Sequence, residues 1–197
     1  MKAILSTLPK DIPVVLASGS PRRRELLGAM GIDFRVLVSE ADETPPFGAT
    51  PAEAVAAIAR RKAEAILDGV TQDTLVIAAD TTVELDGLVL GKPRSEDEAL
   101  SMLLSLSGRA HRVHTGVAVA YRGRILSATD TTEVTFLPFD EATARDYVAT
   151  GEPMDKAGAY GIQGLGGRLV AGILGEFDNV VGLPCALLEK MLTEATA

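Results

Sequence analysis

Tryptophan is absent from this sequence and only 4% of its 197 residues are aromatic, so its core has to be built from aliphatic side chains. The one cysteine, Cys185, excludes an internal disulfide and fits a reducing compartment. No histidine partner is evident near it, so we expect Cys185 to pack in the core. No run reaches the roughly 18 apolar residues of a membrane span, and Met1–Leu16 is too mixed for a secretory signal. These absences predict a cytoplasmic protein with no membrane partner.

A strongly basic composition is also lacking, because 19 Lys and Arg residues face 27 Asp and Glu residues and give a net charge of −8. A general nucleic-acid binder needs a basic surface, so we expect no nucleic-acid partner. A single nucleotide is still allowed, since a small polyanion needs only a local cluster of cations. Hydrophobic residues make up 47% of the chain, enough for a sizeable core.

Short apolar runs alternate along the chain with segments that begin with helix-capping residues. Capping boxes start at Thr50 and Ser95, and Asp86-Gly87 between apolar runs is a hairpin signal. This alternation predicts an α/β fold with a mixed sheet, in one domain (residues 1–197) with two lobes around a cleft. The strands are expected at Val14–Ala17, Leu75–Ala79, His111–Tyr121 and Arg124–Phe136, with a hairpin over Val83–Leu90. The helices are expected at Pro21–Met30, Pro51–Gly69, Ser95–Gly108, Asp140–Thr150 and from Pro184 onward.

A candidate phosphate site lies in Ser18-Gly19-Ser20-Pro21-Arg22-Arg23, directly after the first predicted strand. Ser20 can cap the following helix, and proline suits the first helical position. The backbone N–H groups at the helix start and two guanidinium groups would then converge. Such a place favours phosphate, because the helix start is partially positive and arginine pairs bidentately with phosphate oxygens.

Asp80 follows the buried run Leu75–Ala79, at the strand end where α/β proteins gather their ligand sites. A carboxylate there can hold Mg²⁺ or take a proton from water. The alternative is that Asp80 merely starts a turn, with Thr81 and Thr82 capping it.

Lysines supply further candidate phosphate contacts. Lys92 is fixed between Gly91 and Pro93, although an exposed turn lysine is the alternative. In the run Arg60-Arg61-Lys62, the first two side chains are expected on the solvated face of a helix, and Lys62 is expected to turn inward.

Glu40, Asp42 and Glu43 are the other candidate metal ligands, although a solvated acidic loop explains at least two of them. Mg²⁺ usually takes one or two carboxylates together with substrate oxygens. His111 and His114 are separated by an odd number of positions on a predicted strand, so they face opposite sides of the sheet. We expect them to be structural.

Small residues dominate the segment Asp155–Gly164, within a glycine-rich stretch from Gly151 to Gly182. Glycines allow backbone to approach a ligand closely. Lys156 adds charge, and Gln163 has the paired donor and acceptor that read a nucleobase edge. Together with Arg22, Lys92 and Asp80, the segment indicates a nucleotide cleft.

These blocks together resemble the Maf family of nucleoside triphosphate pyrophosphatases, most closely the branch that acts on dTTP and UTP. The resemblance extends from Leu16 to the last helix, and Gln163 between Ile162 and Gly164 is what points to that branch. The matching blocks are Leu16–Arg23, Ala79–Thr81, Gly91–Pro93, Leu106–Gly108, Lys156–Gly164 and Asn179–Pro184.

The resemblance implies an elongated mixed sheet flanked by helices, with two lobes around a deep cleft, as in the Maf and ITPase folds. It implies hydrolysis between the α and β phosphates, a divalent cation such as Mg²⁺ or Mn²⁺, a cytoplasmic location and often a homodimer. The position of Asp80 is the family's proton acceptor. The positions of Arg22, Thr81 and Gln163 are associated with substrate choice.

We therefore expect dTTP and UTP, or modified pyrimidine nucleotides, to be split into a monophosphate and pyrophosphate. Phosphate contacts are expected from Ser18, Ser20, Arg22, Arg23, Lys62, Lys92 and Lys156, and metal contacts from Asp80, Glu40 and Glu43. One alternative is a nucleotide-binding regulator of cell division that needs no turnover. Another is a house-cleaning enzyme for inosine-type nucleotides, which would prefer a purine.

Overall fold

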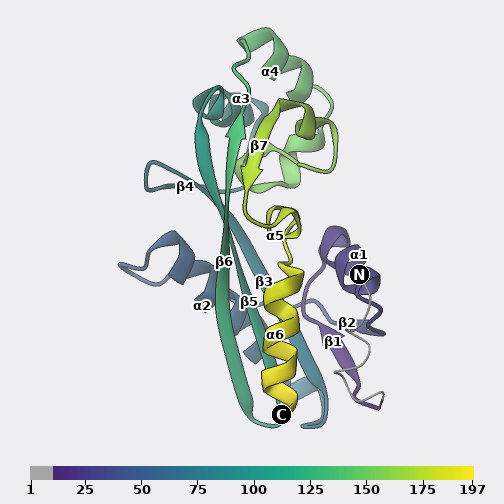
Figure 1. Cartoon of the computed structure of the whole chain (residues 1–197). Coiled ribbons are helices and arrows are strands. Elements are labelled where there is room, and N and C mark those ends of the chain that lie inside the picture. The colour runs from purple at the N-terminus through teal and green to yellow at the C-terminus, as the bar shows by residue number, and fades with distance from the viewer. Residues whose placement is uncertain (1–10) are drawn as a thin grey trace. The chain divides into compact units, whose positions relative to one another are not determined.

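The computed structural model describes residues 11–197 and contains two compact units (Figure 1). The first unit consists of the described residues up to Asp80, together with Thr115–Asp130 and Gly182–Ala197. The second consists of Thr81–His114 and Thr131–Val181. Each unit is described separately below.

The strands in the described chain form one sheet of seven strands in the order β2-β1-β3-β5-β6-β7, with β4 paired to β3. β1 pairs in parallel with β2 and β3, whereas the β3/β4 and β6/β7 pairs are antiparallel, so the predicted mixed sheet is confirmed. The strands are β1 (Val14–Leu16), β2 (Arg35–Val36), β3 (Leu75–Leu85), β4 (Leu88–Leu90), β5 (Ala110–Tyr121), β6 (Arg124–Phe136) and β7 (Val170–Leu174).

The helices agree with the caps in the sequence. Thr50 forms the predicted capping box with Glu53, and Asp140 caps its helix through the backbone N–H of Thr143. The α-helices are α1 (Pro21–Ala29), α2 (Pro51–Glu64), α3 (Glu96–Leu106), α4 (Glu141–Val148), α5 (Phe177–Val181) and α6 (Cys185–Thr196). Within residues 11–197, none of these helices has the length and apolar character that crossing a membrane would require.

In the first unit, helices cover both faces of the sheet, because successive strand residues point to opposite sides. α1 and α6 pack on the face that carries Leu16 and Ile77, and α2 packs on the face that carries Ala78 and Ala118 (Figure 1). The α2 face is rich in alanine, so the helix lies close to the strands. This close approach sets the position of every side chain that α2 carries.

The second unit has its own core, built by β3, β5 and β6 with α3 and α4. Phe136 is 1% exposed at its centre, with the rings of His111 and Tyr160 packed edge-on at 4.9 and 4.7 Å. Most of the other core side chains are aliphatic, as the scarcity of aromatic residues predicts.

Stability should fall in mild acid because of His111, which is 3% exposed and whose Nδ1 has no hydrogen-bond partner among residues 11–197. Burial lowers the pKa of His111 from 6.5 to about 4. The unfolded chain therefore takes up this proton near pH 6.5 and the folded chain only near pH 4, so the unfolded state binds more protons between these values. We expect this group to cost up to about 3 kcal/mol of unfolding free energy as pH falls through that window.

Urea denaturation of wild type and His111→Gln between pH 7 and pH 4 measures this contribution. The variant loses the titrating group, so its unfolding free energy should fall less steeply with pH. Parallel pH profiles for the two proteins would refute the assignment.

One predicted strand end is wrong, because the strand expected at Leu75–Ala79 continues as β3 to Leu85. No glycine or proline interrupts the run after Ala79, and the β-branched residues Thr81 and Thr82 favour extended backbone. The chain reverses instead at Asp86-Gly87, the predicted hairpin, where both residues have positive φ. Asp80 therefore lies within a strand rather than at its end, and it does not start a turn.

Two helix details also differ. The helix expected to reach Gly69 ends at Glu64, and a 3₁₀ turn follows over Leu67–Gly69 that lets Ile66 bury its side chain. At Ser95 only half of the predicted capping box forms. The hydroxyl of Ser95 accepts from the backbone N–H of Glu98, but the Glu98 carboxylate accepts from Arg94.

The region between Gly151 and Gly182, for which no element is predicted, contains three 3₁₀ turns, β7 and the short helix α5. The segment at 33–47 contains the two-residue strand β2, which was not predicted. The two strands that were not predicted, β2 and β7, lie at the ends of the sheet order, where each pairs with one neighbouring strand only.

Candidate active site

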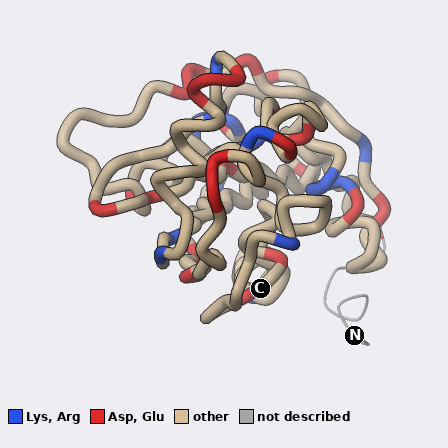
Figure 2. Tube along the Cα trace, turned by 90° about the horizontal axis from the view of Figure 1, so that it is seen from above, with Lys and Arg blue, Asp and Glu red and all other residues tan. Residues whose placement is uncertain are grey.

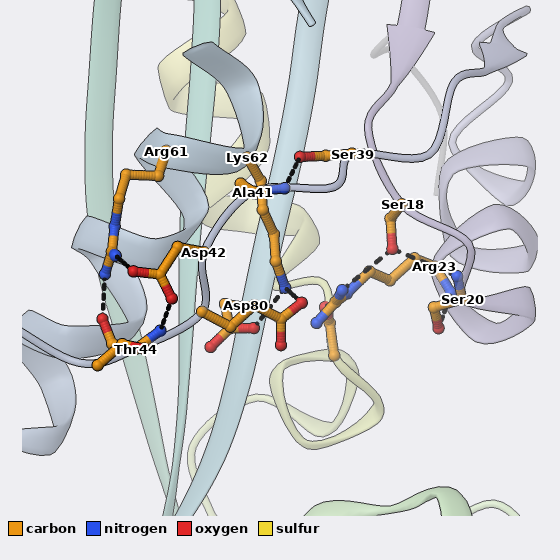
Figure 3. A network of polar contacts seen from close by, with 12 residues as sticks. Ser18, Ser20, Arg23, Ser39, Ala41, Asp42, Thr44, Arg61, Lys62 and Asp80 are labelled. Carbon is orange, nitrogen blue, oxygen red and sulfur yellow. Dashed lines mark hydrogen bonds and ion pairs between the residues drawn. The ribbon is translucent and has the colours of Figure 1, made fainter. Parts of the chain in front are cut away.

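The start of α1 holds the guanidinium of Arg23 in a fixed position (Figure 3). Nη1 of Arg23 donates to the hydroxyl of Ser18 at 3.1 Å, and Nε donates to the carbonyl of Gly182 at 2.8 Å. The same Ser18 hydroxyl accepts from the backbone N–H of Ser20 at 3.3 Å. Ser18, which is 7% exposed, therefore orients both the arginine and the turn that leads into the helix.

Ser20 caps α1 as predicted, accepting a long hydrogen bond from the backbone N–H of Arg23, and Pro21 opens the helix. Part of the hydrogen-bonding capacity of the predicted phosphate site is therefore used within the chain, since Ser18 and Ser20 already accept hydrogen bonds from backbone N–H groups of the turn. The predicted role of this segment toward a polyanion would therefore depend mainly on the charge of Arg22 and Arg23, added to the positive end of the helix dipole.

Lys62 turns inward from α2 as predicted and is only 8% exposed. Its ammonium lies 2.7 Å from Oδ1 of Asp80 on β3 and 2.8 Å from Oε1 of Glu43 (Figure 3). The Asp80 side chain is 16% exposed and that of Glu43 is 63% exposed. One buried cation thus holds two carboxylates together, one on the sheet and one on the acidic loop.

Arg23 belongs to the same cluster of charges. Burial lowers the pKa of Arg23. The negative charge of Asp80 raises this pKa, the positive charge of Arg22 lowers it further, and the negative charge of Glu43 raises it, but the net shift is downward. A guanidinium stays protonated in proteins, so Arg23 remains a cation. Arg23 therefore lies close enough to Asp80, Glu43 and Arg22 to interact with their charges, and Lys62 is paired with the same two carboxylates. The predicted contacts of these side chains with phosphate stay predictions.

The loop that carries Glu43 is fastened by Arg61, whose role sequence reasoning missed. Arg61 donates to the carbonyl of Thr44 at 2.5 Å and lies 3.5 Å from Asp42 (Figure 3). Asp42 also accepts from the backbone N–H of Thr44 at 2.9 Å. Arg61 was expected on the solvated face of its helix. The one signal in the sequence for a contact with the loop is that Arg61 directly precedes the inward-facing Lys62.

The donor set suits a divalent cation held by two carboxylates. Asp80 and Glu43 already share one positive charge, and Mg²⁺ in proteins is commonly held by one or two carboxylates plus phosphate oxygens. Glu40 is exposed at the start of the loop. Among residues 11–197, no group of three or more His, Cys, Asp or Glu side chains is arranged to hold a metal ion. The expected participation of Glu40 stays a prediction.

The other predicted residues belong to the second unit. Lys92 and Gln163 are exposed, and Thr81 is partly exposed in β3. The Lys156 ammonium donates to the backbone carbonyl of Glu152 and to Asp155, both at 2.6 Å. Their predicted roles toward phosphate and base stay predictions.

The histidines have structural partners. His111 Nε2 lies 2.8 Å from the hydroxyl of Tyr160. The two ring nitrogens of His114 lie 2.8 Å from Thr131 and 2.7 Å from Glu84. Cys185 packs beside the core of the first unit, as expected.

Acidic and basic residues are interspersed along the trace in the view of Figure 2, in keeping with the net charge of −8. Against this acidic background, Arg23 and Lys62 lie beside Asp80 and, with Arg22 next to Arg23, form a local concentration of positive charge. Two carboxylates lie among them, so the cluster carries both the cations that attract phosphate and the acids that can orient water or a metal.

Comparison with known proteins places the chain in one family. A family model described as Maf-like protein matches residues 13–195. The dTTP/UTP pyrophosphatase of Pelotomaculum thermopropionicum is 52% identical over 91% of this chain and 94% of its own. The protein of that name from Halalkalibacterium halodurans is 48% identical over 91% of this chain and 94% of its own. Among solved structures, the Staphylococcus aureus Ham1 protein is 17% identical, with a TM-score of 0.45 over 63% of this chain and 71% of that one.

Proposed function

Because the chain belongs to the Maf family, we propose that it is a nucleoside triphosphate pyrophosphatase that hydrolyses dTTP and UTP. The observation that supports the proposal is the pairing of Lys62 with Asp80 beside Arg23, in a chain that is 52% identical to a protein named for this activity. Water attacks the α phosphorus, the bond from that phosphorus to the bridging oxygen breaks, and pyrophosphate leaves with the bonding electrons.

Cations stabilise the charge that this reaction builds up. Arg23 is oriented by Ser18 and Gly182 before any substrate arrives, so little reorganisation is needed when phosphate oxygens bind. Arg22 and Lys62 add charge at the same place, and Lys92 and Lys156 are proposed to contact the departing pyrophosphate. Preorganised donors of this kind commonly supply several kcal/mol of transition-state stabilisation.

Asp80 is proposed to orient the attacking water and to take its proton. The carboxylate is partly buried and held by Lys62 through Oδ1. This bond fixes the direction in which the carboxylate faces, as general-base catalysis requires.

A divalent cation fits the same place, with Asp80 and Glu43 as its proposed protein ligands. When bound, such a cation supplies charge neutralisation of the phosphate oxygens. Lys62 keeps the two carboxylates near each other without it. A cytoplasmic location and a homodimer belong to the same proposal.

Gln163 is proposed to recognise the uracil or thymine edge, whose carbonyl and imide N–H match one amide side chain. Replacing it by alanine should reduce the preference for UTP over CTP about tenfold and leave kcat for UTP much less affected, because the amide touches the base and not the reacting phosphate. The measurement is kcat/KM for both nucleotides. Lys190→Ala, which removes an exposed side chain of α6, is the control. An unchanged preference would remove Gln163 from base recognition.

Pyrophosphate release across UTP, dTTP, CTP, ATP, GTP and ITP tests the proposal. We expect UTP and dTTP to be hydrolysed with the highest kcat/KM, each giving a monophosphate and pyrophosphate in equal amounts. Binding of these nucleotides without turnover, or a preference for ITP, would refute the proposed function.

A further inference from the structure

The glycine-rich loop that carries Gln163 is tied down by an acidic side chain from outside the loop. The Glu152 carboxylate accepts the backbone N–H of Leu165 at 2.9 Å through Oε2 and that of Gly166 at 3.1 Å through Oε1. Oε1 also accepts from the hydroxyl of Tyr147 at 2.8 Å. At the other end of the loop, the oxygen of that hydroxyl accepts the backbone N–H of Gly161 at 3.1 Å. The pair Glu152–Tyr147 thus fastens both ends of the segment 161–166.

The loop is wrapped tightly around this pair. A Cβ atom added at Gly164 would lie 2.5 Å from the Glu152 carboxylate oxygens, so only glycine permits the observed approach. Gln163 immediately precedes this position and is exposed, while Tyr147 is 6% exposed beneath the loop. Gln163 therefore lies in an exposed part of a segment whose backbone is held by hydrogen bonds to Glu152 and Tyr147.

The charges of the pair suit this role. Burial raises the pKa of Glu152, but the hydrogen bonds from Leu165, Gly166 and Tyr147 and the charge of Lys156 outweigh it and hold the pKa below its ordinary value. Burial and the neighbouring carboxylate raise the pKa of Tyr147, so its hydroxyl keeps the proton that it donates. Both groups therefore stay in the state that forms the hydrogen bonds.

We infer that Glu152 and Tyr147 are positioning residues for substrate choice, which hold the 161–166 loop so that Gln163 presents its amide to the pyrimidine base. This inference rests on the proposed function, because it takes Gln163 to be the residue that meets the base. Neither residue touches substrate in this scheme. Their effect passes through the backbone of the loop.

The test compares Glu152→Gln and Tyr147→Phe with wild type in kcat/KM for UTP and CTP. Each variant should lower the UTP preference about tenfold while kcat for UTP changes less than threefold (roughly the loss of one or two hydrogen bonds to a charged group). Glu141→Gln, an exposed residue of α4 paired with Arg145, is the matched control and should behave as wild type. Tyr147→Phe keeps the ring, so it serves if Glu152→Gln does not fold.

A double variant distinguishes the positioning of Gln163 from a general loss of stability. In Gln163→Ala protein, adding Glu152→Gln should leave the already reduced UTP preference unchanged, since there is no amide left to position. Amide hydrogen exchange should show faster exchange at Gly161, Leu165 and Gly166 in Glu152→Gln. Unchanged UTP preference in both single variants, or additive losses in the double variant, would overturn the inference. Failure of the proposed function itself would be seen separately, as absent pyrophosphate release by wild type.

Discussion

Replacing Asp80 with asparagine is expected to lower kcat for UTP about a thousandfold, the loss typical of a removed general base. The amide is the same size, and its oxygen can still accept from Lys62, so fold and nucleotide binding should persist. The charge and the proton-accepting capacity are what disappear. The measurements are steady-state kinetics, urea denaturation and UTP binding by calorimetry.

Asp73→Asn is the matched control for this variant. Asp73 is an exposed aspartate of the same unit, paired with Arg122, and its loss should leave kcat near wild type. Full activity in Asp80→Asn would remove Asp80 from the mechanism. Loss of activity together with loss of the folded state would assign it a structural role instead.

Adding one methyl group at Gly116 should destabilise the protein by about 3 kcal/mol, the upper range for overpacking a core. A Cβ atom there would overlap the backbone carbonyl of Val55 in α2, and a helix backbone cannot rotate away as a flexible side chain can. Since α2 also carries Lys62, the shift should move the ammonium from Asp80 and lower activity. Urea denaturation and kcat for UTP measure the two effects of Gly116→Ala.

Gly28→Ala provides the comparison, because a Cβ at this α1 position meets nothing within 4 Å. It should be neutral or stabilise the protein by up to about 1 kcal/mol, through the better helix propensity of alanine. If Gly116→Ala unfolds at the same urea concentration as wild type, α2 is not packed against β5 as described.

The residues that fix local geometry could be predicted from the sequence. Thr50 and Asp140 start helices because their side chains accept backbone N–H groups, and Asp86-Gly87 turns because both residues tolerate positive φ. The inward turn of Lys62 was also predictable, because it lies four residues after Ile58 on the buried face of its helix. Such features depend on neighbours within about four residues.

The features that were missed depend on long-range contacts. Asp80 was expected at a strand end, but β3 continues to Leu85 beside the twelve-residue strand β5, its neighbour in the sheet, and this pairing joins residues far apart in the sequence. β7 is a strand through its pairing with β6, although two glycines lie in or beside it. The anchoring of Glu43's loop by Arg61, and of Gln163's loop by Glu152, likewise joins residues that no local pattern connects.

The central claim is that Asp80 directs water to the α phosphorus of a pyrimidine triphosphate, whose charge the neighbouring cations neutralise. Hydrolysis of UTP in ¹⁸O-labelled water, followed by mass spectrometry of both products, tests it most directly. The account predicts one ¹⁸O atom in the nucleoside monophosphate and none in pyrophosphate. Label in the pyrophosphate, or release of a nucleoside diphosphate and inorganic phosphate, would contradict it.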